Sequence, residues 1–341
     1  MTRASGLNRG VANSKWRQAR LLILCYHGIS QDDEHEWNPE LFMSPRTFTR
    51  RLQLLHDGGY SVLPLAEAYD RLRQGNLPSK SVVLTFDDGA TNFRTVALPI
   101  LKTFGYPSTV YLRTDYCSYP RPVYPPVGPY LLWKRRDRVV AACPELGWTD
   151  EQDLRTVEGR TRAWSSILRL VDEHEATAAE HDAVLEKMAT HIGLDYAAFV
   201  ESGILQIMNR EDIAAIACEG VDVQLHTHRH RLVTSLGVGE KLRFEIEENQ
   251  RQIHTMTGTN AVHFCYPSGK FSEESLPALR NLGIVTATTC EPAMVTKGSE
   301  PLLLPRYVDT NVKSEAEFEA WLSGIGSLLP QRQAGRKRNL Y

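Results

Sequence analysis

Apolar and polar positions divide this chain into short apolar runs and longer stretches in which apolar residues recur with a helical period. This alternation is typical of β/α units arranged around a parallel sheet or barrel. Strands are predicted over residues 21–26, 81–86, 108–112, 221–225, 262–266 and 284–288. Helices are predicted over residues 47–57, 65–74, 92–104, 209–219 and 314–322.

One stretch interrupts the alternation. Five prolines lie between Cys117 and Tyr130, and such a proline-rich segment is a stiff linker. Residues 131–206 then have the pattern of several helices, including 155–171 and 176–191, and contain no strand-like run. The simplest interpretation is a helical insertion at about residues 115–206 between two barrel strands, either shaping a substrate site or serving as decoration.

Charge is distributed unevenly along the chain. The net charge of −2 offers no general attraction for nucleic acid, and 42% hydrophobic residues are enough to bury a core. Five cations and no acid precede Asp32, while four cations and no acid follow Glu319. We therefore predict flexible basic tails over residues 1–20 and 323–341. These tails are either solvated or attracted to an anionic membrane.

Cysteine usage and hydropathy bear on the compartment. The six cysteines have no paired spacing, so we expect buried, reduced thiols. Residues 21–24 form the only apolar run near the N-terminus, which is too short for a secretory signal, and no window has the length of a membrane span. These features predict a cytoplasmic protein, with peripheral contact at the inner face of the membrane as a further possibility.

The most informative motif is the run from Val82 to Gly89, in which a buried strand ends in Asp87, Asp88 and a glycine. The carboxyl end of a strand is where a β/α fold places its functional site. A loop there can turn both carboxylates toward a cation, one as a ligand and one free as a base. The alternative is an Asp-Gly turn that caps a helix.

A second motif, from His226 to His230, directly follows the predicted strand 221–225. On a single helical turn His226 and His230 would face the same way and His228 would point elsewhere. Two histidines and one carboxylate suit zinc or a similar divalent ion and leave positions open for water and substrate. The alternative is a solvated polar loop, but both motifs end apolar strands and would meet at one barrel mouth.

A third histidine, His27, follows the first predicted strand and is suited to general acid chemistry, or else to packing near a turn. Aromatic residues offer platforms for sugar stacking, although such residues more often form core. They are Trp37, Tyr124, Tyr130, Trp133 and Tyr266.

The Thr-Phe-Asp-Asp-Gly run at 85–89 and the His-Thr-x-x-His run at 226–230 resemble the motifs of the polysaccharide deacetylases, the NodB-like carbohydrate esterases of family 4. Tyr-His-Gly at 26–28, residues 264–269 and Leu-Pro-Arg at 304–306 resemble the branch that contains the poly-N-acetylglucosamine deacetylases. The resemblance covers about residues 21–309, apart from the insertion. It implies a distorted (β/α) barrel of the polysaccharide deacetylase type with a helical insertion.

The resemblance also implies roles for individual residues. Asp87 corresponds to the general base, and Asp88, His226 and His230 correspond to the metal ligands. The resemblance thereby implies a divalent ion, zinc first and cobalt or nickel next. It further implies a hydrolase that removes N-acetyl groups from an amino-sugar glycan or glycan precursor, with metal-activated water attacking the acetyl carbonyl.

Two family features are altered here. The family's Arg-x-Pro-Tyr motif aligns with residues 265–268, so no arginine stands at Cys265, and Tyr266, Pro267 and the backbone N–H of Ser268 are left for substrate and oxyanion contacts. The family's late histidine is absent near residues 304–306. In the branch with an early Tyr-His, that histidine takes the acid role, so the resemblance implies His27 as the acid and leaves Arg306 to orient Asp87 or to bind substrate.

Three alternatives remain open from the sequence. The chain could remove O-acetyl esters, or it could deformylate or deacetylate a lipid-linked sugar. It could also be a degenerate barrel that binds glycan without turning it over.

Overall fold

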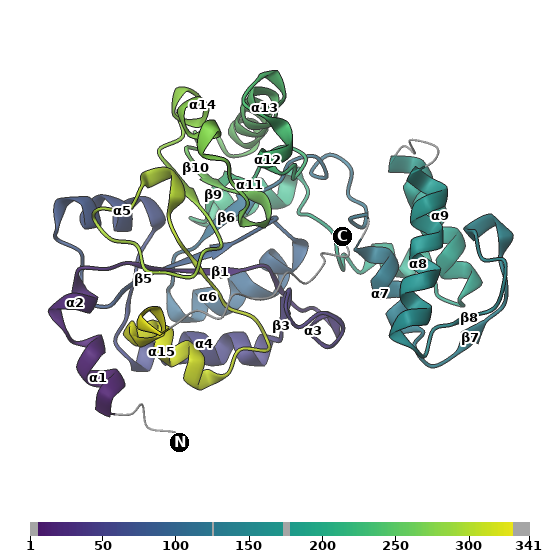
Figure 1. The fold of residues 1–341 in the computed structure, drawn as a ribbon, viewed down its shortest axis with the longest axis horizontal. Coiled ribbons are helices and arrows are strands. Elements are labelled where there is room, and N and C mark those ends of the chain that lie inside the picture. The colour runs from purple at the N-terminus through teal and green to yellow at the C-terminus, as the bar shows by residue number, and fades with distance from the viewer. Residues whose placement is uncertain (1–5, 125, 173–177, 330–341) are drawn as a thin grey trace. The chain divides into compact units, whose positions relative to one another are not determined.

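The computed structural model describes residues 6–124, 126–172 and 178–329, which form two compact units (Figure 1). The larger unit contains the described residues up to 119 and from 208 onward, and the smaller unit contains residues 120–207. Among the described helices, none combines the length and the apolar character needed to cross a bilayer.

The larger unit is built on a curled sheet of parallel strands in the order β11-β10-β9-β6-β5-β1-β12, with β4 beside the start of β5. All six predicted strands are present with ends trimmed by up to two residues. They are β1 (Leu22–Tyr26), β5 (Ser81–Phe86), β6 (Thr109–Leu112), β9 (Asp222–Leu225), β10 (His263–Cys265) and β11 (Thr286–Thr288). The pattern missed β4 (Ser61–Val62) and β12 (Tyr307–Val308), because two residues carry no periodicity. A separate short pair joins β2 (Gly28–Ile29) and β3 (Phe42–Met43).

The segment 304–308 links the two edges of the curled sheet. Leu304 forms a parallel bridge to Thr288 at the end of β11, and its N–H donates to the carbonyl of Ala287. Three residues later, Tyr307 pairs with Leu24 on β1. Arg306 lies between these two anchor points and is fully buried. The confirmed distorted (β/α) barrel is therefore closed by the segment that carries Arg306.

Helices cover the sheet, and their ends follow local sequence rules. Pro45 opens α4 after Ser44, whose hydroxyl accepts from the N–H of Thr47, and Asn209 with Asp212 forms a capping box at α11. The covering helices are α4 (Pro45–Asp57), α5 (Leu65–Gln74), α6 (Leu98–Phe104, preceded by a π-turn over Phe93–Ala97), α11 (Arg210–Cys218), α12 (Val233–Leu236), α13 (Glu240–Thr257), α14 (Leu276–Asn281) and α15 (Glu315–Ser323), with α3 (Glu34–Trp37) in a loop.

The sequence pattern missed α13, which is 18 residues long. Its buried face carries Leu242, Ile246 and Ile253, but Glu245 and Asn249 are buried beside them. Because two strongly polar residues occupy core positions, the helical apolar period is interrupted there.

The smaller unit contains α7 (Val127–Lys134), α8 (Val157–Asp172), α9 (Ala178–His191) and α10 (Tyr196–Glu201) around its own apolar core. Trp148 lies at the centre of that core, and its indole N–H donates to the carbonyl of Ala163 at 2.9 Å. A short antiparallel pair of β7 (Val139–Val140) and β8 (Gln152–Asp153) corrects the expectation of a purely helical segment. Residues 176–177 of the predicted helix lie outside the described residues.

The N-terminal segment differs from the flexible tail expected over residues 1–20. It forms α1 (Gly6–Ala12) and α2 (Lys15–Gln18), and Arg17 is fully buried. The Arg17 guanidinium donates to the carbonyls of Leu322 and Ser81 at 2.9 and 3.1 Å, which ties the segment to the barrel. Residues 1–5 and 330–341, with Arg3, Arg332, Arg336, Lys337 and Arg338, lie outside the described residues.

All six cysteines are free. Four are buried as expected, whereas Cys218 is exposed and Cys290 is partly exposed.

Candidate metal and catalytic site

The predicted site residues meet at one end of the barrel. Asp87 and Asp88 follow β5, His226 and His230 follow β9, and His27 follows β1. Because all these strands are parallel, their carboxyl ends lie at the same edge of the sheet. Motifs that are far apart in the sequence therefore lie together in one site.

Asp88, His226 and His230 form a group whose candidate ligand atoms all lie within 4.8 Å of one another. The Oδ1 atom of Asp88 lies 3.4 Å from Nε2 of His226 and 3.3 Å from Nε2 of His230. This oxygen is buried and has no hydrogen-bond partner. A buried acceptor without a donor is unfavourable, and a cation between the three atoms would satisfy it.

The tautomer of His226 also fits a metal ligand. Its Nδ1 lies 2.8 Å from the carbonyl oxygen of Cys265, which can only accept, so Nδ1 carries a proton and Nε2 faces Asp88. Burial lowers the pKa of His226, but neighbouring groups that include the carboxylates of Asp88 and Asp87 raise it well above its usual value, so a bound ion would displace a proton from Nε2. Burial lowers the pKa of His230 to about 4, against the opposing effect of Asp88, so this ring is neutral at neutral pH. The donor set of two imidazoles and one carboxylate suits a divalent ion such as zinc.

The backbone brings these ligands together in a way that differs from the expected helical turn. Residues 226–230 form a loop in which Thr227 and His230 have left-handed φ angles of 58° and 55°. Asp88 and Gly89 are also left-handed, at 70° and 79°. Each such non-glycine residue costs about 1 kcal/mol, so surrounding contacts must hold these loops in place.

Asp87 is bound by an arginine from the closing segment. Arg306 Nη1 and Nη2 donate to Asp87 Oδ1 and Oδ2, each at 2.7 Å, and both side chains are buried. Burial opposes the charge on Asp87, but the Arg306 guanidinium outweighs burial and holds the pKa of Asp87 well below its usual value. Asp87 is therefore an ionised carboxylate beside the candidate metal group.

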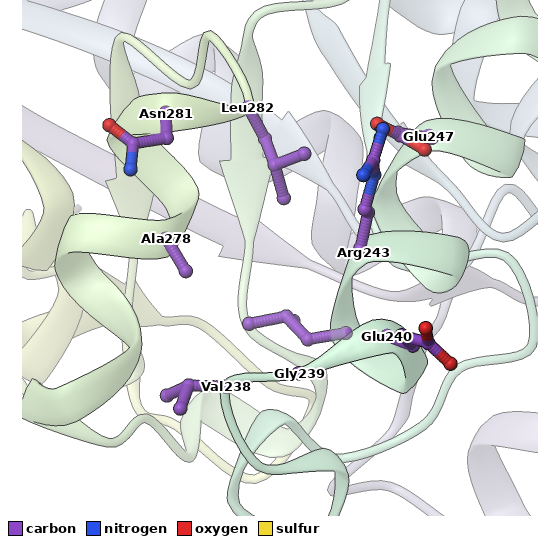
Figure 2. Close-up of a pocket in the computed structure, with 9 residues that line it drawn as sticks. Val238, Gly239, Glu240, Arg243, Glu247, Ala278, Asn281 and Leu282 are labelled. Atoms are coloured by element: carbon purple, nitrogen blue, oxygen red, sulfur yellow. The ribbon is translucent and has the colours of Figure 1, made fainter.

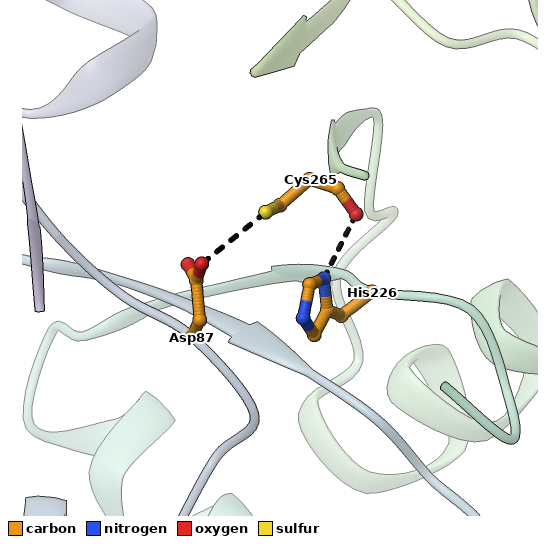
Figure 3. Close-up of side chains that lie close together, drawn as sticks. All are labelled: Asp87, His226 and Cys265. Atoms are coloured by element: carbon orange, nitrogen blue, oxygen red, sulfur yellow. Dashed lines mark hydrogen bonds between the residues drawn. The ribbon is translucent and has the colours of Figure 1, made fainter. Parts of the chain in front are cut away.

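Cys265 occupies the position where the family motif has an arginine. Its Sγ lies 3.5 Å from Asp87 Oδ2 and 3.0 Å from Arg306 Nη2. Figure 3 shows its thiol directed at Asp87 and its carbonyl at His226. The arginine contact to Asp87 thus comes from Arg306 in the closing segment. Asp87, His226 and Cys265 also lie close enough to share an ion. However, both carboxylate oxygens of Asp87 already accept hydrogen bonds from Arg306.

His27 lies at the partly exposed side of the site, where its Nε2 is 3.9 Å from Asp87 Oδ2. Ser268 is exposed on a tight turn, Pro267–Gly269, with a left-handed φ of 55°. Tyr266, in contrast, is fully buried, and its hydroxyl donates to the carbonyl of Leu302 at 3.0 Å. The Tyr266 ring therefore serves packing, which corrects its placement among substrate contacts, and Pro267 is also buried.

The other aromatic candidates have packing partners. Trp37 lies against Phe42 in the larger unit. Tyr130 is fully buried in the smaller unit. Tyr124 stacks on His181, and Trp133 lies beneath Arg136. These contacts favour structural roles for the four residues.

A pocket on the larger unit lies away from the predicted site residues (Figure 2). It is lined by residues at α13 and α14 and just before α13, including Val238, Leu282, Arg243 and Glu247. Arg243 and Glu247 pair with each other at 2.8 Å, and neither cluster of candidate metal ligands found among the described residues lines this pocket.

The sequence profile described as polysaccharide deacetylase matches residues 74–140 and 158–287, more than half of the chain. The chain belongs to the polysaccharide deacetylase family. The matched residues of this family member include Asp87, Asp88, His226 and His230, whereas His27 and Arg306 lie outside them.

A curated relative is similar to this chain over most of its length. The poly-beta-1,6-N-acetyl-D-glucosamine N-deacetylase of Escherichia coli strain K12 is 24% identical over 325 residues, which is 94% of this chain and 41% of the relative. The deacetylase-family chain therefore spans less than half the length of that curated relative.

Two solved structures share the fold. Streptococcus pyogenes deacetylase PplD aligns with a TM-score of 0.58 at 19% identity, over 92% of this chain and all of its own. IcaB from Ammonifex degensii aligns with a TM-score of 0.55 at 17% identity, over 89% of this chain and 97% of its own.

Arg306→Gln tests the Arg306 contact in this deacetylase-family site. Without the guanidinium, burial dominates, and the pKa of Asp87 rises. We expect the acidic limb of the kcat/KM profile for acetate release to move to higher pH by at least about one unit. Arg51→Gln is the matched control, because Arg51 forms another buried pair, with Asp309 at 3.0 Å. An unshifted limb in Arg306→Gln would contradict the contribution of Arg306 to the charge on Asp87.

Proposed function

We propose that this chain hydrolyses N-acetyl groups of an amino-sugar glycan or glycan precursor. A divalent ion, zinc first and cobalt or nickel next, would be held by Asp88, His226 and His230. The observation that carries the proposal is the convergence of three candidate ligand atoms beside the ionised carboxylate of Asp87. The activity named for the Escherichia coli relative supports an N-acetylated glucosamine polymer as the substrate class.

The roles of the residues follow from their contacts. When bound, the ion would polarise the acetyl carbonyl and make a water molecule more acidic. Asp87 accepts the proton of the attacking water, and Arg306 keeps Asp87 ionised and oriented. His27 donates a proton to the departing amine from the partly exposed side. The N–H of Ser268 donates to the developing oxyanion.

The test is acetate release from a panel of N- and O-acetylated oligosaccharides, with zinc, cobalt or nickel restored to stripped protein. We expect release from N-acetylated substrates that depends on the added ion. Preferential release from O-acetylated substrates would indicate an esterase instead. Binding of the glycans without release of acetate would indicate a degenerate glycan-binding barrel, and formate release from an N-formyl sugar would indicate a deformylase.

His27→Ala tests the general acid. We expect hydrolysis of an unactivated acetamide to fall by about 10²–10⁴-fold, the contribution of a positioned acid. An aryl acetate should be affected much less, because its leaving group needs little protonation. His35→Ala is a control, since His35 has no predicted role in the site. Equal losses on both substrates would contradict the assignment of His27 as the acid.

We also propose a cytoplasmic location, with a lipid-linked or membrane-bound precursor as substrate. The cations outside the described residues would each contribute about 1 kcal/mol near an anionic surface. Arg17 cannot contribute, because it is buried. Sedimentation with anionic vesicles should show association at low salt that weakens at high salt. A full-length protein that stays in the supernatant at low salt would exclude this contact.

A further inference from the structure

Helix α13 carries two polar side chains into the core of the larger unit. Glu245 and Asn249 are four residues apart, so they lie on the same face of the helix, and both are fully buried. Burying a carboxylate and an amide is unfavourable unless each finds partners. Their partners are the candidate metal-binding loop and the chain just after β6.

Asn249 joins His226 to the neighbouring strand. The backbone N–H of His226 donates to Asn249 Oδ1 at 2.9 Å. The Nδ2 group of Asn249 donates to the carbonyl of Leu112 at 3.0 Å and to the Thr114 hydroxyl at 3.1 Å. The Asn249 amide therefore fixes the position of the His226 backbone relative to the end of β6.

Glu245 holds the middle of the same loop. The Glu245 carboxylate accepts from the backbone N–H and from Nε of Arg229, at 2.8 and 2.6 Å. The backbone carbonyl of Glu245 accepts from the N–H of His228 at 3.0 Å. The ring of His228 in turn lies 2.9 Å from the Thr114 hydroxyl. Two of the three residues between the histidine ligands, His228 and Arg229, are thus held from one side by α13.

These bonds hold the part of the site that is conformationally unfavourable. The loop contains two left-handed residues, Thr227 and His230, and such a backbone persists only where its surroundings determine it. We propose that Glu245 and Asn249 are positioning residues that hold the 226–230 loop in the shape that lets His226 and His230 bind one ion. This inference rests on the proposed metal site.

The experiment measures zinc affinity by competition with a chromophoric chelator, and the visible spectrum of the cobalt-loaded protein, for Glu245→Gln and Asn249→Ala. We expect affinity to fall by about 10–100-fold, the usual effect of losing an outer partner of a ligand. Asn249→Asp keeps the acceptor for His226 and should recover part of the affinity. Glu247→Gln and Gln250→Ala are matched controls: Glu247 is exposed, and Gln250 donates to the carbonyl of Leu282 at 3.1 Å, away from the loop.

The outcomes separate positioning from general stability. Folded variants that bind zinc within twofold of the wild type, with an unchanged cobalt spectrum, would overturn the inference. An equal loss of affinity in Gln250→Ala would also overturn it, because the effect would then come from the helix as a whole. Should Asn249→Ala fail to fold, Glu245→Gln and Asn249→Asp decide. If the wild type binds zinc but releases no acetate, the proposed function fails while this test still stands.

Discussion

Replacing Asp87 by asparagine is expected to leave the metal bound and to remove most turnover, about 10²–10⁴-fold. The amide has the shape of the carboxylate but cannot accept a proton from water at neutral pH. Asp87 is also not one of the three proposed ligands, so the ion should remain. The measurement is kcat for acetate release, together with the metal content of the same sample.

This replacement also disturbs a buried ion pair, so a control is needed for loss of stability. Asp309→Asn is the control, because Asp309 is also buried and lies 3.0 Å from Arg51, although burial raises the pKa of Asp309 to about 7, so its pair is less fully ionised than that of Asp87. Breaking one partner of a buried pair typically costs about 3–5 kcal/mol. If both variants are destabilised and only Asp87→Asn loses turnover, the loss is chemical. Near-normal turnover in Asp87→Asn with metal bound would show that another group is the base.

Replacing Asp88, His226 or His230 by alanine is expected to abolish stable metal binding and, with it, acetate release. Each change removes one of three protein ligands, so the loss should exceed the roughly 10–100-fold that follows removal of an outer partner. The measurement is bound metal per chain after dialysis. Alanine at the exposed His254 on α13 is the control for general removal of a histidine. Full metal content in any of the three variants would exclude that residue as a ligand.

Much of the barrel and the convergence of the motifs could be predicted because they depend on local patterns. The apolar runs before Asp87, His226 and His27 form strands β5, β9 and β1. Parallel strands align their carboxyl ends, so residues that follow such runs gather at one edge without further information. The capping signals at Asn209 are likewise contained within four residues.

The conformation of the two ligand-bearing turns was not predictable in the same way. A spacing of four residues is equally compatible with a helical turn and with a loop containing left-handed residues. The loop conformation at Thr227 and His230 is selected by contacts to Glu245 and Asn249 on α13. The apolar pattern did not predict this helix, because these two buried residues are polar.

The amino-acid sequence by itself determined six strands of the curled sheet, the paired acids and histidines, and hence which side chains stand at the mouth of the barrel. Only the tertiary structure decided that Arg306 pairs with Asp87, one of the two roles that the resemblance left open, although the two residues are 219 positions apart. It also decided that Tyr266 faces the core and that Arg17 is buried against Leu322. The physical reason is that these contacts arise when the closing segment and the N-terminal helices pack on a finished sheet. No local periodicity encodes which distant groups then become neighbours.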